Sequence, residues 1–203
     1  MRLLTALALT TIVIFSGCDT AKDDTTKNDD GGNGAAPATT PEGAYALSQD
    51  NMSVTFVGEK PNGESHRGRF ETLSGHMKFN ADNLDECSVQ VTIDMDSLWS
   101  DAQGLTNHLK QNDFFNVVEY PESKFVSTQF THVEEDTYNI LGNLTIRDVT
   151  KEVTFPAIIT QKDDALNLTI EYSLKRTDFN VNFKPDQVND MVPLKIAINA
   201  KQE

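Results

Sequence analysis

The amino-acid sequence predicts an all-β domain with one short helix, preceded by an N-terminal targeting segment. The main observation is that apolar and polar residues alternate in eight short segments after residue 50. Such alternation is typical of β-strands, because successive side chains point to opposite faces of a sheet. Gly, Asn, Asp and Pro cluster between the segments, as turns require. Regularly spaced short strands predict a sandwich or a barrel, and alternation alone does not distinguish the two.

The eight predicted strands are each defined by one apolar face. In residues 166–174, for example, Leu166, Leu168, Ile170 and Tyr172 fall on one side of the strand. The predicted strands are residues 51–59, 70–79, 89–95, 125–130, 138–146, 153–159, 166–174 and 192–198. Residues 63–67, which are mostly polar, are interpreted as a hairpin loop.

Residues 100–115 are the one clear helical segment. Ser100 and Gln103 have the spacing of a capping box, and His108 and Leu109 share an apolar helical face with Leu105. The pair Phe114–Phe115 follows directly. This segment is expected to close one end of the folded sheet, either as the mouth of a cavity or as a plug that completes the core.

The first residues read as a targeting signal that ends at a cysteine. Arg2 precedes an apolar run that is shorter than the ~20 residues needed to cross a bilayer. Ser16 and Gly17 before Cys18 resemble the site at which bacterial lipoproteins are cleaved and acylated. We therefore expect a lipoprotein signal peptide over residues 1–17, with acylated Cys18 holding the protein to a membrane. The alternative is an ordinary secretory signal with an incidental cysteine.

Residues 18–44 are expected to form the lipidated cysteine and a disordered tether, and residues 45–203 the folded domain. From residue 19 to about residue 44 the tether has no large apolar residue. It therefore cannot bury enough surface to offset the entropy that ordering would cost. The net charge of −14 argues against binding to nucleic acid, because phosphate contacts need clustered Lys and Arg. If Cys18 is acylated, Cys87 has no partner, and we expect it to pack inward as a small, unreactive apolar side chain.

Several short motifs occur together in the second half of the chain. They are Asn107–Leu109, Asp113–Phe115, Tyr120–Pro121, Phe125–Ser127, Gly142–Ile146, Val149–Lys151 and Arg176–Phe179. In their order and spacing the chain resembles the YceI-like family of small bacterial secreted proteins, from about Tyr45 to the C-terminus. This resemblance implies an eight-stranded antiparallel lipocalin-like barrel with a short helix near one end, and a long isoprenoid lipid inside it.

The resemblance also implies which residues contact the ligand. These would be the inward-facing apolar residues together with a histidine of the helical segment, namely Phe56, Phe70, Val91, Ile93, His108, Phe114, Phe115, Phe125, Ile140, Leu144, Phe155, Ile170 and Tyr172. At roughly 0.3 kcal/mol per heavy atom, burial of a forty-carbon chain would contribute about 12 kcal/mol. Chain burial alone would then give tight binding, but it would specify the identity of the lipid poorly.

The functional hypothesis is a binding or carrier protein for an isoprenoid-type lipid, tethered to a membrane on the periplasmic side of the bacterial envelope. No cofactor or metal is expected, because the four His lie outside HExxH-type motifs and the chain has no Gly-x-Ser-x-Gly sequence. We therefore predict no catalytic residues. Two alternatives stay open: an envelope interaction module with a filled core, and an enzyme that acts on a lipid through inward polar residues such as His66 or His108. A homodimer also stays open.

Four small residues at predicted inward positions bear on whether the interior is hollow. Gly58, Gly75, Gly142 and Ala157 either leave empty space or mark bends of the strands. At Gly142, a large side chain is expected to block lipid uptake if the interior is empty, and to unfold the domain if it is filled.

Overall fold

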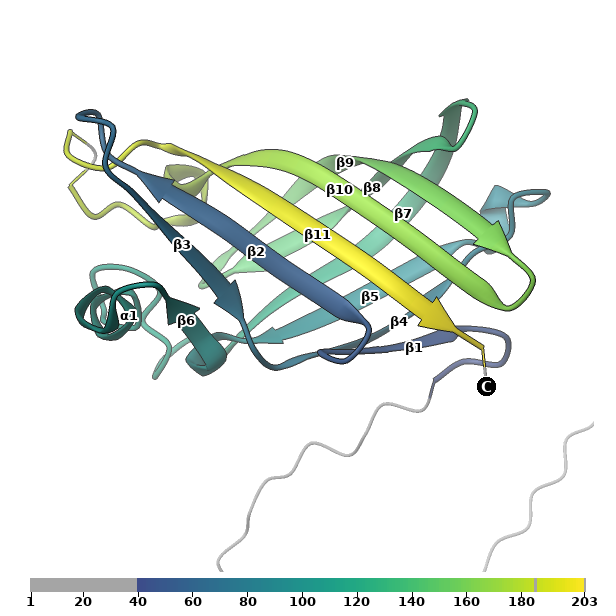
Figure 1. The fold of residues 1–203 in the computed structure, drawn as a ribbon, viewed down its shortest axis with the longest axis horizontal. Helices are drawn as coiled ribbons and strands as arrows, with labels where there is room; N and C mark the ends of the chain where they lie inside the picture. Colours follow the sequence, from purple (N-terminus) through teal and green to yellow (C-terminus); the bar gives the residue numbers. More distant parts are fainter. Residues whose placement is uncertain (1–39, 185, 203) are drawn as a thin grey trace, which may run out of the picture. The chain divides into compact units, whose positions relative to one another are not determined.

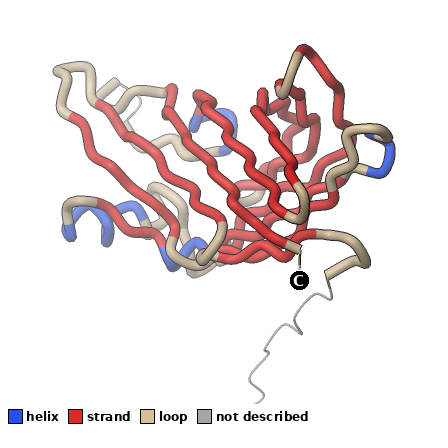
Figure 2. The backbone as a smooth tube through the Cα atoms, turned by 45° about the vertical axis from the view of Figure 1, so that its right-hand side comes forward, coloured by secondary structure: helices blue, strands red, loops and turns tan. Residues whose placement is uncertain are grey.

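The domain is a curled antiparallel sheet of eleven strands with one α-helix at its rim (Figures 1 and 2). The computed structural model describes residues 40–184 and 186–202, and the helix and strand counts refer to these residues. The predicted signal peptide, Cys18 and nearly all of the predicted tether lie outside them. The predictions of an all-β antiparallel fold and of a short helix near one end are confirmed.

The strands run in chain order along the sheet, with three exceptions. Their bounds are β1 (Tyr45–Ser48), β2 (Met52–Glu59), β3 (Ser65–Phe70), β4 (Leu73–Lys78), β5 (Ser88–Asp94), β6 (Leu98–Ser100), β7 (Glu122–Glu134), β8 (Thr137–Ile146), β9 (Val149–Lys162), β10 (Ala165–Lys175) and β11 (Met191–Lys201). The helix α1 is Gln103–Leu109, and three short 3-10 turns are η1 (Leu84–Glu86), η2 (Met95–Ser97) and η3 (Arg176–Phe179). The order in the sheet is β1-β4-β5-β7-β8-β9-β10-β11-β2-β3-β6.

The predicted number of eight strands is wrong, because three long strands are each broken by a bend. β1 pairs with β4 through Ser48↔Ser74, and β2 pairs with β3 through Thr55↔Arg69. In the same way, β5 pairs with β4 and β6 pairs with β3. β1 with β2, β3 with β4 and β5 with β6 are thus each one long strand that a bend divides into two. The additional strands β1, β3 and β6 were missed because β1 and β6 are very short and β3 begins in a polar sequence that had been interpreted as a loop.

The sheet curls until it returns to its own start. β2 pairs with β11 on one side, through Phe56↔Leu194, and with β3 on the other, through Phe56↔Gly68. β3 is followed directly by β4, which lies near the opposite end of the sheet order. A barrel-like body results, with one face of every strand turned inward, as Figure 1 shows.

The alternation in the sequence decides which side chains lie inside. In β8, Tyr138, Ile140, Leu144 and Ile146 are buried, while Asn143 is exposed. The buried residues of β8 belong to a continuous apolar core that includes residues from all eight of the predicted strands. The interior of the curled sheet is therefore the hydrophobic core of the domain.

The helix is shorter than predicted. α1 ends at Leu109 because the chain then tightens, with the N–H of Gln111 donating to the His108 carbonyl at 3.0 Å and Asn116 in the left-handed region at φ 48°. Ser100 does not form the predicted capping box. It ends β6, and its hydroxyl bonds the Thr106 hydroxyl at 3.0 Å, which fixes α1 to the sheet. Within residues 40–184 and 186–202, no helix has the length and hydrophobicity needed to cross a membrane.

Two of the small inward residues mark close approaches of the backbone rather than empty space. A Cβ on Gly142 would lie 2.5 Å from the Val126 carbonyl oxygen, beside the irregular register of β7 and β8. A Cβ on Gly75 would lie 2.1 Å from the Gln90 carbonyl oxygen. Of the two alternatives left open for Gly142, empty space is therefore excluded, and a large residue there would disrupt strand pairing whether or not the interior is hollow. Gly58 differs, because no atom lies within 4 Å of its ideal Cβ.

Replacement of Leu144 by Arg is expected to destabilise the domain severely. Leu144 is 9% exposed on the inner face of β8, where a guanidinium would be buried without a partner. We expect a loss of at least about 3 kcal/mol, a large part of the stability of an ordinary domain. Chemical denaturation measures this loss in the free energy of unfolding. Asn143→Arg, on the exposed face of the same strand, is the control, and equal losses in both variants would contradict the assignment of the two faces.

Candidate functional site

The interior of the sheet contains a cavity of about 200 Å³. Its wall is almost entirely apolar and is formed by β2, β3, β5, β7, β8, β9, β10 and β11, with residues from η2, from α1 and the segment after it, and from the segment that follows β10. Most of the predicted contact residues line it: Phe56, Phe70, Val91, Ile93, Phe114, Phe115, Phe125, Ile140, Leu144, Phe155 and Ile170. That they touch a ligand stays a prediction.

Two predicted contact residues do not line the cavity. His108 points to the surface side of α1, where its Nε2 lies 2.8 Å from Asp113 Oδ2. Its ring packs edge-on against Phe114 and Phe183, with centroid distances of 5.0 and 4.7 Å. Tyr172 packs against Phe155 at 4.9 Å, outside the cavity lining. Position on an inward or apolar face was therefore not sufficient to predict contact with the cavity.

The polar pairs considered for catalysis are also absent from the cavity wall. His66 bonds Asp101 at 2.8 Å, on a partly exposed part of β3. The pKa of Asp101 is lowered, first by the hydrogen bond from the Arg67 backbone N–H and then by that from His66. Neither His66 nor His108 lines the cavity. In the described part of the chain, no group of three or more His, Cys, Asp or Glu is placed to hold a metal ion.

Several lining residues were not predicted. Those on strands, such as Val54, Leu168 and Ile196, continue the same inward alternation and could have been found from it. Those in the segment after β10, Phe179, Val181 and Val188, follow no period-two pattern because they lie in 3-10 and irregular structure. The sequence contained no signal that would have placed this segment over the cavity.

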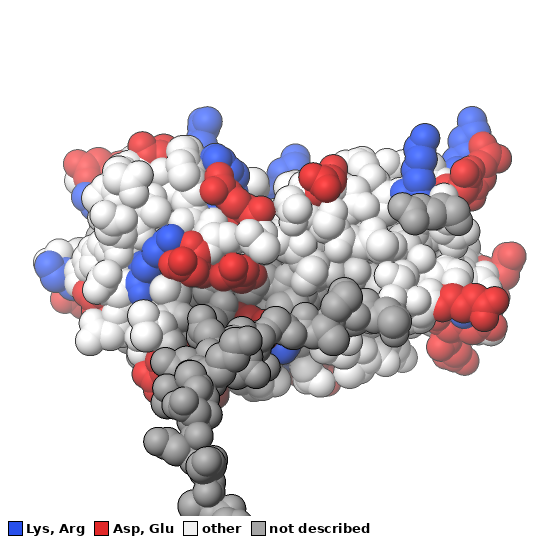
Figure 3. Space-filling model, turned by 90° about the horizontal axis from the view of Figure 1, so that it is seen from below, with Lys and Arg blue, Asp and Glu red and all other residues white. Residues whose placement is uncertain are grey.

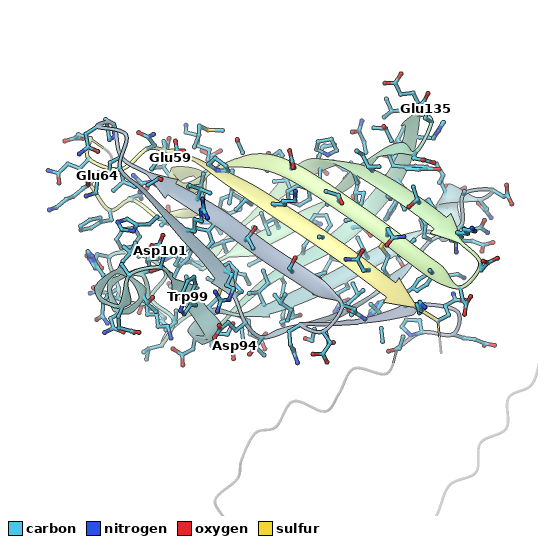
Figure 4. All side chains as sticks on the ribbon, in the orientation of Figure 1. Glu59, Glu64, Asp94, Trp99, Asp101 and Glu135 are labelled. Carbon is cyan, nitrogen blue, oxygen red and sulfur yellow. The ribbon has the colours of Figure 1, made fainter. Side chains whose placement is uncertain are left out.

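One end of the barrel is covered by two segments. The first is α1 with residues 110–121, and the second is η3 with residues 180–184 and 186–190. Both contribute lining residues, among them Phe114 and Phe179. Figure 1 shows α1 and the β10–β11 connection at the same end, and Figure 4 places Glu59, Glu64 and Asp101 there, with Glu135 at the opposite end.

Arg147 holds the two covering segments together. It occupies the turn between β8 and β9, in the left-handed region at φ 55°. Its Nη1 donates to the Phe114 carbonyl at 2.6 Å and to the Asn180 carbonyl at 2.7 Å. Because each carbonyl belongs to a different segment, one guanidinium fixes the cover of the cavity.

Arg176 is the buried cation of this end. It is 5% exposed, and its three nitrogens donate to the carbonyls of Asn189, Val181 and Val188 at 3.0, 2.6 and 2.9 Å. Burial lowers the pKa of Arg176 from its ordinary value, and the charge of Asp190 opposes this. Asp178, two residues further on, pairs instead with Lys151 and Lys175, at 3.6 and 3.7 Å.

Asp190 is tied to the same segment. It accepts hydrogen bonds from the Thr177 hydroxyl at 2.9 Å and from the Thr177 N–H at 3.1 Å. The hydroxyl bond is the main reason that the pKa of Asp190 is lowered. The connection that follows β10 is therefore held by its own polar contacts, independently of Arg147.

Cys87 is partly buried and packs against the core. Its sulfur accepts the N–H of Asn80 at 3.2 Å. Burial raises the pKa of the Cys87 thiol, which keeps it protonated and unreactive.

The size of the cavity limits what fits in this conformation. Pockets for drug-sized ligands typically measure 300–1,000 Å³, so about 200 Å³ accommodates only part of a long chain. Aromatic rings fill much of the remaining interior, including the pairs Phe56–Phe70 and Phe125–Phe155 at 5.8 and 5.1 Å. A long chain would therefore fit inside only if some of these side chains moved.

The outer surface carries charges of both signs. On the face shown in Figure 3, Asp and Glu lie among Lys and Arg, and the described residues form no continuous basic patch on that face. The described residues on this face therefore lack the clustered positive charge that binding to nucleic-acid phosphates requires.

Comparison with known proteins relates the whole folded domain to one family. Residues 45–200 match the model of the YceI-like domain. A UPF0312 protein of Pectobacterium carotovorum is 32% identical over 142 residues, which are 67% of this chain and 73% of the relative. A UPF0312 protein of Pseudomonas putida is 36% identical over 90 residues, or 44% of this chain, and the match spans only 47% of that relative's length.

Solved structures share the fold. BcnA of Burkholderia cenocepacia superposes with a TM-score of 0.70 at 26% identity, covering 74% of this chain and 96% of BcnA. A polyisoprenoid binding domain from Saccharophagus degradans, implicated in plant cell wall breakdown, superposes with a TM-score of 0.64 over 79% of this chain and 99% of that domain. At 12% identity, the second likeness is one of fold.

Replacement of Arg147 by Met is expected to loosen the cover of the cavity. The variant keeps the aliphatic length of the side chain but loses both hydrogen bonds to the covering segments. Because hydrogen bonds to a charged group each contribute about 1.5–3 kcal/mol, we expect a loss of about 2 kcal/mol or more. Amide hydrogen exchange should accelerate in residues 110–121 and 176–184. Lys151→Met, which removes an exposed ion pair at 3.6 Å, is the control and should cost less than about 1 kcal/mol. Unchanged exchange in the Arg147 variant would refute the role of this residue.

Gly58→Ile is expected to reduce the cavity without unfolding the domain. Gly58 lines the cavity, and its ideal Cβ has no neighbour within 4 Å. A β-branched residue also suits a strand better than Gly. We therefore expect unchanged or higher thermal stability together with weaker binding of an apolar fluorescent probe. Val57→Ile, at the adjacent position on the other face of β2, should change neither property. Unfolding of the Gly58 variant would show that the space is not available.

Proposed function

The chain belongs to the YceI-like family, and from that membership and its apolar cavity we propose that it binds a long-chain lipid of the isoprenoid type inside the barrel. Binding rather than catalysis is the role that this interior supports. The proposal has two parts, the ligand and the tethering of the domain to a membrane.

The observation that carries the first part is the composition of the cavity wall. Apolar side chains from eight strands face a common space, with Ser123, Lys124 and Arg176 as the polar or charged exceptions among the lining residues. Lys124 is exposed and pairs with Glu122 at 2.8 Å, so its charge lies outside. Such a wall favours molecules that gain free energy from burial of hydrocarbon, at about 0.8 kcal/mol for each CH₂.

An elongated interior favours a chain over a compact apolar molecule. The lining residues extend along β2 from Met52 to Gly58 and along β10 from Leu168 to Leu174. A fold neighbour is known as a polyisoprenoid binding domain, which supports an isoprenoid as the ligand class here. A methyl-branched chain would fill a space lined by Phe, Ile, Val and Leu with many small contacts.

The second part of the proposal is a carrier function at a membrane. Acylation of Cys18 would hold the protein on the periplasmic side of the bacterial envelope, with residues 19–44 as the tether. Stable anchoring needs at least two acyl chains, as bacterial lipoproteins have. A tethered domain with a lipid cavity can take a chain from one membrane site and release it at another.

A second candidate function is an interaction module with a mostly filled core. The observation that favours it is the small volume of about 200 Å³, since many aromatic side chains already occupy the interior. In that case the interior would exclude apolar probes, and the outer surface would carry the function.

Ligand content after purification distinguishes these functions. The full chain is expressed in a bacterial host with its envelope, extracted in mild detergent, and analysed by native mass spectrometry and by mass spectrometry of the organic extract. We expect one apolar chain lipid per protein in a substantial fraction of molecules. The Gly58→Ile protein, purified in parallel, should retain less. Repeated preparations without any apolar ligand would contradict the proposal and support the interaction module.

A further inference from the structure

Four polar or charged side chains are buried in the part of the chain that the structure describes. They are Ser100, Thr106, Ser123 and Arg176. Ser100 and Thr106 bond each other at 3.0 Å and do not line the cavity. The other two line it, so the polar groups of the cavity wall are few and specific.

Ser123 is the unusual member of this set. Its side chain is 4% exposed, and its hydroxyl has no hydrogen-bond partner among residues 40–184 and 186–202. It lies on the inward face of β7, two residues before Phe125 and opposite Ile93 on β5, and all three line the cavity. Burial of a hydroxyl without a partner is unfavourable, and native proteins seldom leave such a group unpaired. A ligand that supplies a polar atom at this point would remove the cost.

Arg176 lies at the same end of the barrel. Ser123 is the second residue of β7, which begins after the segment that follows α1, and Arg176 directly follows β10. Figure 1 shows these strand ends on the side that carries α1, away from the β7–β8 turn at Glu135 that Figure 4 labels. The guanidinium is bonded only to carbonyls, and within the described residues no carboxylate forms an ion pair with it. The α1 end therefore combines an unpaired hydroxyl with a positive charge.

These two groups suit a neutral oxygen better than a phosphate. Arg176 already uses one N–H on each of its three nitrogens for carbonyls of its own segment. One hydroxyl and a partly committed guanidinium cannot satisfy the many oxygens of a diphosphate. The surrounding wall is apolar, and transfer of a doubly charged group into it would be very costly.

We propose that the α1 end of the cavity is a head-group subsite, in which the Ser123 hydroxyl donates a hydrogen bond to a neutral carbonyl oxygen of the bound lipid. The chain then extends from this end toward the β7–β8 turn. This inference rests on the proposed function, and it adds the orientation of the ligand and the chemistry of its head.

Three probes with the same prenyl chain test the subsite: a prenyl methyl ketone, the corresponding hydrocarbon and the prenyl diphosphate. Their affinities are measured by displacement of an apolar fluorophore from the wild type, Ser123→Ala and Ser173→Ala. Ser173 is an exposed residue of β10 outside the cavity lining and serves as the control. We expect the wild type and Ser173→Ala to bind the ketone about 2- to 12-fold more tightly than the hydrocarbon, the range for one net hydrogen bond. Ser123→Ala should lose this preference while binding the hydrocarbon as well as the wild type does.

Thermal melting of the ligand-free proteins gives an independent readout. Removal of an unpaired buried hydroxyl should leave the melting temperature of Ser123→Ala unchanged or raise it. A fall relative to Ser173→Ala would show that the hydroxyl already has a structural partner, and would overturn the subsite. Equal affinities of the wild type for ketone and hydrocarbon, or tightest binding of the diphosphate, would overturn it while the proposed function stands. If no probe binds, the proposed function is wrong and the subsite with it.

Discussion

The short connections between strands at opposite ends of the sheet order are the constraint on which the rest of the structure depends. β1 and β4 begin that order, yet β1 is followed directly by β2 and β3 directly by β4, and β2 and β3 lie near its other end, so the sheet has to curl until its two ends come close. Once the sheet curls in this way, the alternation of each strand turns its apolar side chains toward a shared interior. The bends that divide three strands allow this curvature without loss of pairing. The hydrophobic core, the cavity inside it and the hypothesis of a lipid ligand all follow from this arrangement.

The interior is asymmetric along its length, and this asymmetry shapes the functional account. At the α1 end, two covering segments meet through Arg147, while Ser123 and Arg176 bring polar groups to a wall that is otherwise apolar. A cover held mainly by a few hydrogen bonds can open at moderate cost, whereas the strands themselves cannot. The cavity of about 200 Å³ would then be one state of a site that, under the proposed function, expands when a chain enters.

Much of this architecture could be predicted from the sequence, and the errors have identifiable physical causes. Alternation placed Val91, Ile140 and Phe155 correctly inside, because a strand with one buried face has no other way to be stable. Period-two patterns do not report bends, so only one part of each of the three bent strands was predicted. These patterns also do not report close backbone contacts, so they could not decide between empty space and a bend of the strand at Gly142. The role of Arg147 could not be predicted, because it depends on carbonyls more than thirty residues away in each direction.

Electron density inside the barrel tests the central claim most directly. A high-resolution crystal structure of the protein, purified from a bacterial envelope without added lipid, would show what occupies the interior. The account predicts elongated density that cannot be assigned to protein, with one end at Ser123 and a length that requires displacement of the Phe56–Phe70 pair or of the covering segments. An interior filled completely by the protein's own side chains, or by ordered water alone, would contradict it.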